Sequence, residues 1–164
     1  MPTITERDWT KPVLNEKTGL YGPTNKFATD VKPEYHWWNR MMQAPPEPVG
    51  SIKDPDSKIY PWKRTKYTII ADASSNLTVF IKAGTYAVTG DPGAAAKQGA
   101  EDLKQNYSGQ WKGVDETMVF APNHQVAPKT EALKCNVCHS AQGILDFKAL
   151  GYSEDRIKSL TTNR

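Results

Sequence analysis

Cysteine and histidine are scarce in this chain of 164 residues, which contains two cysteines and three histidines. So few cysteines exclude a framework of several disulfides. No apolar run approaches the roughly 18 residues that a membrane-spanning helix needs, so no transmembrane segment is predicted. The net charge of +3 is too small to indicate a partner made of nucleic acid. Internal repeats are also lacking, which excludes a solenoid and leaves one compact unit as the expected organisation.

The two cysteines stand together in Cys135-Asn136-Val137-Cys138-His139, the C-x-x-C-H spacing of c-type haem attachment. The two thiols can form thioethers to the haem vinyl groups, and the imidazole of His139 can bind the iron from one face. We therefore predict one covalently attached haem c (heme c), held by Cys135, Cys138 and His139. Two other interpretations are a redox disulfide, which the missing βαβ pattern disfavours, and half of a zinc site completed by His139 or His124.

A second axial ligand is expected upstream of the motif, because neither histidine nor methionine follows His139. His124 is the preferred candidate, since Pro122 and Pro128 flank it and stiffen its loop. Ten residues of chain reach roughly 33 Å, enough to bring His124 to the opposite haem face. His36 is the alternative distal ligand, although either histidine could instead form a hydrogen bond or pack. The remaining candidates are methionines: Met1, Met41, Met42 and Met118.

The first third of the chain differs in composition from the rest. Nine of the twelve prolines lie in residues 1–63, together with many of the tryptophans and tyrosines. Dense proline breaks helices and central strands, whereas a disordered tail would be poor in aromatics. We predict an extended arm rich in proline and aromatic residues over residues 1–63 and a haem-binding domain over residues 64–164.

The predicted fold class is α+β, largely irregular, with a β-hairpin and a few short helices packed around one haem c. The hairpin is expected from residues 66–71 and 77–82, which are β-branched and aromatic and flank a polar turn. Helices are expected where helix-favouring residues follow a start signal such as Pro33, Pro92, Pro128 or Ser153. Their predicted ranges are residues 33–42, 94–106, 129–139, 146–150 and 154–160, and residues 117–121 are expected to be extended.

Three runs near the motif resemble the C-terminal haem segment of octahaem cytochromes c of the tetrathionate-reductase type. They are residues 118–129 (MVFAPNHQVAPK), 132–139 (ALKCNVCH) and 143–152 (GILDFKALGY). Residues 35–39, 59–63 and 106–109 resemble stretches that precede that segment. The resemblance implies electron transfer through a bis-His haem with His124 as an axial ligand. Those proteins carry many C-x-x-C-H motifs and this chain carries one, so reductase activity is not implied.

We expect an electron-transfer protein rather than an enzyme, carrying a low-spin haem and acting as a carrier or as a subunit of a redox complex. Its expected partners are other redox proteins, either multihaem cytochromes or a membrane oxidoreductase complex. Covalent haem is normally installed outside the cytoplasm, so a periplasmic or other extracytoplasmic location is expected. Residues 1–10 lack the apolar core of a signal peptide, which favours a mature or trimmed form or one domain of a longer chain. The alternatives are an open-site haem enzyme or sensor, a structural subunit in which the haem is a passive relay, and a zinc-binding module.

Overall fold

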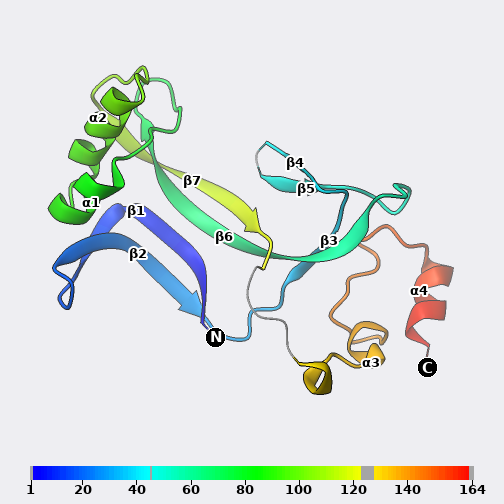
Figure 1. Cartoon of the computed structure of the whole chain (residues 1–164). Coiled ribbons are helices and arrows are strands. Elements are labelled where there is room, and N and C mark those ends of the chain that lie inside the picture. Colours follow the sequence, from blue (N-terminus) through cyan, green and yellow to red (C-terminus); the bar gives the residue numbers. More distant parts are fainter. Residues whose placement is uncertain (1, 45, 123–127, 163–164) are drawn as a thin grey trace. The chain divides into compact units, whose positions relative to one another are not determined.

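The computed structural model of the chain describes residues 2–44, 46–122 and 128–162. The chain forms two compact units, each built from two separate segments (Figure 1). Unit 1 comprises Met1–Val31 and Thr65–Met118, and unit 2 comprises Lys32–Arg64 and Val119–Arg164. The predicted arm, residues 1–63, is therefore divided between both units. The predicted boundary at residues 63 and 64 lies beside the point where strand β6 passes from one unit to the other.

Unit 1 is organised around a β-hairpin near its N-terminal end. Strand β1 (Thr3–Asn15) pairs antiparallel with β2 (Leu20–Ala28), and the turn between them closes with a 2.8 Å hydrogen bond from Gly19 N–H to the Asn15 carbonyl. Gly19 has a φ of +69°, which favours glycine at this position. Part of β1 also pairs in parallel with β6 (Lys58–Asp72), and β7 (Trp111–Phe120) pairs with β6 as well.

Two short helices accompany this sheet. Helix α1 (Ala83–Thr89) is followed by α2 (Pro92–Asp102), which begins where the Asp91 side chain accepts hydrogen bonds from the backbone N–H groups of Gly93 and Ala94. Helix α2 confirms the helix predicted over residues 94–106, and it ends a few residues earlier. The small core of unit 1 consists of buried residues from β6, the following loop and α2: Ile70, Val79, Ala96 and Ala100. Partly buried hydrophobic side chains pack against it: Trp9, Ile81, Tyr107 and Trp111.

The predicted hairpin of residues 66–71 and 77–82 is present only at its turn. Residues 66–71 belong to β6, and the returning chain makes one bridge, Ala71 to Thr78, with a 3.0 Å bond from Val79 N–H to the Ile70 carbonyl. The chain then leaves the sheet for α1, so residues 77–82 are not a strand. Buried Asp72 holds the turn, since it accepts hydrogen bonds from Ser74, Ser75 and Ser108.

In unit 2, strand β3 (Glu34–Trp38) pairs antiparallel with the first part of β6, with Glu34 opposite Trp62 and Trp38 opposite Lys58. A short ribbon of β4 (Met41–Gln43) and β5 (Glu47–Val49) follows. The helix predicted over residues 33–42 is therefore wrong. Its aromatic residues favour a strand, and pairing with β6 outweighs the helix-start signal of Pro33.

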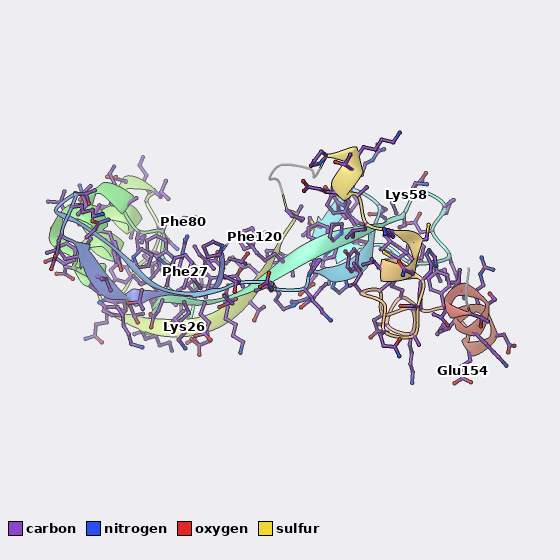
Figure 2. All side chains as sticks on the ribbon, turned by 90° about the horizontal axis from the view of Figure 1, so that it is seen from below. Lys26, Phe27, Lys58, Phe80, Phe120 and Glu154 are labelled. Carbon is purple, nitrogen blue, oxygen red and sulfur yellow. The ribbon has the colours of Figure 1, made fainter. Side chains whose placement is uncertain are left out.

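The C-terminal segment of unit 2 carries short helices. They are the 3₁₀-helix η1 (Lys129–Glu131), α3 (Cys135–Cys138) and α4 (Glu154–Thr161). The helix predicted over residues 129–139 is interrupted, because Ala132 and Lys134 are extended. The helix predicted over residues 154–160 is confirmed. Ser153 caps it as expected, and Glu154, labelled in Figure 2, begins it.

The overall result is an α+β fold with few and short helices, which confirms the predicted class. Within the part of the chain that the structure describes, no helix is both long and apolar enough to cross a membrane.

Candidate haem attachment site

The two cysteines lie on one helical turn. Helix α3 runs from Cys135 to Cys138, and the His139 N–H donates a 2.8 Å hydrogen bond to the Cys135 carbonyl. Residues three apart on a helix lie on the same side of it, so the two side chains point in a common direction. Both are free thiols; Cys135 is exposed and Cys138 is half-buried. Two thiols on one side of a turn, with an exposed imidazole next to them, are the donor set that haem c requires.

The chain folds back tightly behind this turn. Ile144 N–H donates a 2.8 Å hydrogen bond to the Val137 carbonyl, which brings Gly143 against the motif. A Cβ atom added at Gly143 would lie 2.5 Å from the Cys138 carbonyl oxygen and 3.0 Å from the Ser140 carbonyl oxygen. Both are backbone atoms, so only glycine fits here without moving the haem motif. This role of Gly143 was not predicted from the sequence.

A series of aromatic rings leads from the motif to β3. The imidazole of His139 packs against Phe147 with 5.7 Å between ring centroids, and Phe147 meets Tyr152 edge-to-face at 5.4 Å. Tyr152 stacks on Trp37 at 6.2 Å, and Trp37 Nε1–H donates a 2.8 Å hydrogen bond to the Leu150 carbonyl. We call these four rings the ring series: His139, Phe147, Tyr152 and Trp37. The parts of Tyr152 and Trp37 were not predicted from the sequence.

Tyr35 lies on the same face of β3 as Trp37, since alternate residues of a strand share a face. Burial raises the pKa of Tyr35, which lies near Cys138. This face of β3 is therefore the one associated with the haem motif.

His36 lies on the opposite face of β3 from Tyr35 and Trp37. Its Nε2 is 3.1 Å from a Glu34 carboxylate oxygen, and Glu34 accepts a hydrogen bond from Arg64. Arg64 also binds Glu47 through both terminal nitrogens, which raises the pKa of Arg64 and lowers that of Glu47. The structure thus gives the His36 ring a carboxylate partner and directs it away from the face that meets the haem segment.

His124, the preferred second ligand, lies outside the described residues, as does Met1. Among the methionines, Met41 and Met42 are exposed on β4, and Met118 is half-buried in β7. The structure therefore brings Cys135, Cys138 and His139 together and leaves His36 apart from them.

A zinc site at the motif finds no support in the geometry. Within residues 2–44, 46–122 and 128–162, no three side chains of the His, Cys, Asp or Glu type converge to hold a metal ion. This statement covers Cys135, Cys138 and His139, whereas His124, the other histidine considered for a zinc site, lies outside the described residues.

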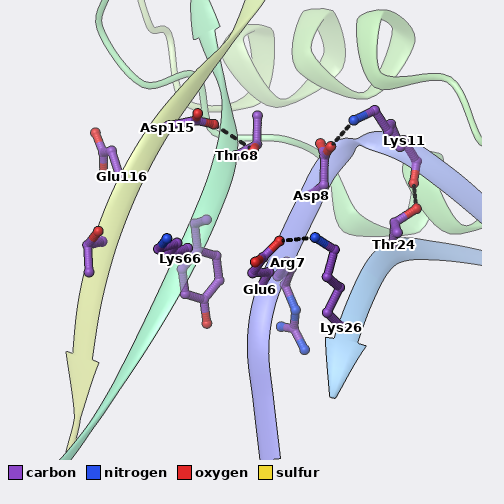
Figure 3. Close-up of a pocket in the computed structure, with 12 residues that line it drawn as sticks. Glu6, Arg7, Asp8, Lys11, Thr24, Lys26, Lys66, Thr68, Asp115 and Glu116 are labelled. Carbon is purple, nitrogen blue, oxygen red and sulfur yellow. Dashed lines mark hydrogen bonds and ion pairs between the residues drawn. The ribbon is translucent and has the colours of Figure 1, made fainter. Parts of the chain in front are cut away.

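Two surface hollows are large enough to be considered as part of a binding site. One, of about 540 Å³, lies directly after the motif between the fold-back and α4, and its lining includes Gly143, Ile144, Phe147 and Ile157. The other, of about 580 Å³, lies in unit 1 on strands β1, β2, β6 and β7 (Figure 3). Four of its charged side chains form two ion pairs, with Lys26 at 2.7 Å from Glu6 and Lys11 at 2.9 Å from Asp8. It offers neither thiol nor imidazole, so the haem site is assigned to the motif.

Comparisons with known proteins agree with this assignment. The model of the family described as "Cytochrome c bacterial" matches residues 44–142, a range that includes the whole motif. The crystal structure of octaheme cytochrome c from Shewanella oneidensis is similar, with a TM-score of 0.68 and 29% sequence identity. The similarity covers 96% of this chain and 44% of that one, so the chain spans less than half the length of that protein. No curated protein matches the chain. The predicted resemblance to octahaem cytochromes c is confirmed.

Proposed function

Because the chain belongs to the bacterial cytochrome c family, we propose that it transfers single electrons through one covalently attached haem c. Family membership supports covalent haem and haem-based electron transfer. The proposal adds that there is one haem in this chain, that it is low-spin and bis-His, and that the chain acts as a carrier or as a subunit of a redox complex. The observation that carries it is the arrangement of Cys135, Cys138 and His139 on and directly after one helical turn.

Each residue of the motif has a separate task in this proposal. Cys135 and Cys138 would form the two thioether bonds, and His139 would bind the iron from one side. Haem c supplies one-electron chemistry when bound, and two imidazole ligands favour a lower reduction potential than an imidazole and a thioether. His124 is proposed as the distal ligand, on its place between two prolines and on the resemblance to octahaem cytochromes c.

His36 remains the alternative distal ligand. Its contact with Glu34, and its place on the face of β3 opposite Trp37, favour His124 over it. Because a closed iron leaves no position for a substrate, bis-His ligation also supports a carrier rather than an enzyme. The proposed partners are other redox proteins, either multihaem cytochromes or a membrane oxidoreductase complex. The proposed location is extracytoplasmic, where haem c is normally attached.

An absorption spectrum and an intact mass test the proposal. We expect one haem per chain that survives denaturation and a sharp α-band on reduction that carbon monoxide does not change. Cys135→Ala with Cys138→Ala should abolish covalent attachment, whereas Ser140→Ala, beside the motif, should not. A chain without a Soret band that binds zinc would refute the haem assignment.

The distal ligand is tested by a matched pair of histidine variants. His124→Ala should convert the ferric haem to high spin and admit carbon monoxide, while His36→Ala should leave the spectrum low-spin. The reverse pattern would move the ligand to His36. Carbon monoxide binding by the unaltered protein would instead support an open-site enzyme or sensor.

A further inference from the structure

We propose that Phe147 is a positioning residue that fixes the plane of the His139 imidazole, and that Tyr152 and Trp37 brace Phe147 against β3. The inference rests on the proposed function, because it assigns a task to the residues behind the proposed axial ligand. It concerns a contact behind the ligand rather than the ligand itself.

The contact between Phe147 and His139 restrains a side chain that is otherwise open to solvent. His139 is exposed, whereas Phe147 is only 4% exposed and is among the most buried residues of unit 2. Their ring centroids are 5.7 Å apart and their planes differ by 35°. A buried ring at this distance and tilt limits rotation of the imidazole about its side-chain bonds, because rotation would drive one ring into the other.

Phe147 is held in turn by a compact turn of the chain. Leu150 N–H donates a 3.0 Å hydrogen bond to the Asp146 carbonyl, and Tyr152 N–H donates one of 3.0 Å to the Phe147 carbonyl. The same turn places the Tyr152 ring edge-to-face on Phe147, with an interplanar angle of 87°. Phe147 is therefore held by a hydrogen bond to its backbone carbonyl and by the contact of its ring with Tyr152.

The turn is anchored to a strand far away in the sequence. Tyr152 stacks on Trp37 with an interplanar angle of 29°, and Trp37 Nε1–H bonds the Leu150 carbonyl at 2.8 Å. The ring series thus connects His139 to β3, which pairs with β6 along its whole length. Partners in the outer shell orient metal ligands and tune the metal, and a buried aromatic stack can do this by shape alone.

The test uses the haem-loaded protein and reads the ligand directly. Phe147→Leu keeps an apolar side chain but removes the ring, and Tyr152→Leu removes the edge-to-face brace. We expect both variants to bind one haem per chain. In both, the g-values of the ferric low-spin EPR spectrum should shift, its features should broaden and the reduction potential should change. The larger effect is expected from Phe147→Leu. Tyr152→Phe retains the ring and should match the unaltered protein.

Two controls separate positioning from general loss of stability. Phe80→Leu changes an exposed phenylalanine of unit 1, labelled in Figure 2, and Ile70→Ala destabilises the core of unit 1. Neither should move the g-values. If Phe147→Leu attaches no haem, the pair Tyr152→Leu and Tyr152→Phe decides the question.

Two results would overturn the inference in distinguishable ways. A haem-loaded protein whose g-values and potential are the same in Phe147→Leu, Tyr152→Leu and the controls would refute the positioning role and leave the proposed function standing. An unaltered protein that attaches no haem at all would refute the proposed function and the inference together.

Discussion

Replacing Gly143 with alanine should displace the haem motif, because the new Cβ meets backbone on two sides. It would lie 2.5 Å from the Cys138 carbonyl oxygen, 3.0 Å from the Cys138 carbonyl carbon and 3.0 Å from the Ser140 carbonyl oxygen. An ordinary contact begins at about 3.4 Å, so the backbone of Cys138 must move away. None of these atoms belongs to a flexible side chain that could give way.

The loss of stability in Gly143→Ala can be estimated. Overpacking of this kind lowers the free energy of unfolding by about 1–3 kcal/mol. For a chain of this length, that loss corresponds to a melting temperature roughly 2–12 °C lower. The fold-back bond from Ile144 N–H to the Val137 carbonyl should lengthen as well, which would shift the two thiols relative to His139.

The assay combines thermal unfolding with haem content per chain. Gly84→Ala is the matched control, since Gly84 lies in α1 with nothing within 4 Å of the added Cβ. It should be neutral or stabilise by about 0.5 kcal/mol, because alanine favours helix over glycine. A Gly143→Ala variant with the melting temperature and haem content of the unaltered protein would refute the close approach described here.

Two further predictions concern unit 1. Hydrogen bonds from Ser108 and Ser74 hold the pKa of Asp72 well below its usual range, so its contribution to stability is complete above the unfolded-state pKa and is lost as pH falls through the lower folded-state value. Urea unfolding followed downward from about pH 5 should therefore show a loss of stability that Asp72→Asn reduces, and equal pH dependence in both proteins would contradict this assignment. Gly99→Ala should destabilise strongly, since its Cβ would overlap the Phe80 carbonyl oxygen. Circular dichroism on heating checks it, and a variant as stable as the unaltered protein would show that α2 can move away from Phe80.

The haem motif could be predicted from sequence because its chemistry is local. Cys135, Cys138 and His139 are neighbours in the chain, and one helical turn suffices to align them. The same holds for α4, whose cap Ser153 and first-turn acids are adjacent in sequence. The predictions for Cys135, Cys138 and His139 as haem-binding residues stay predictions until the spectra are measured.

Long-range pairing explains what the sequence could not reveal. Residues 34–38 contain helix-compatible residues after Pro33, and their pairing with residues 58–62 makes them a strand. Nothing local in Trp37 indicates that Tyr152 stacks on it. Gly143 could have been suspected from its place just after the motif, although only the structure identifies which carbonyl it approaches.

Proline is compatible with strand pairing in the N-terminal third. Its density argued for an extended arm, yet residues 3–28 form a paired hairpin. Pro12 and Pro23 lie opposite each other where the register of β1 and β2 shifts, between Asp8 and Pro12. An irregular site in the pairing tolerates a residue that lacks an N–H group.

The discontinuous make-up of unit 2 sets the order in which its parts are synthesised. Its first segment, Lys32–Arg64, is complete before any of Val119–Arg164 is made. At about 5–20 residues per second, several seconds separate the emergence of β3 from that of Cys135. Trp37 and its strand partner on β6 are thus both synthesised before the C-terminal segment that packs on Trp37. The thiols are thus synthesised after both strands of that pair, and a fragment that begins at residue 64 would carry the thiols without the strand that supports them.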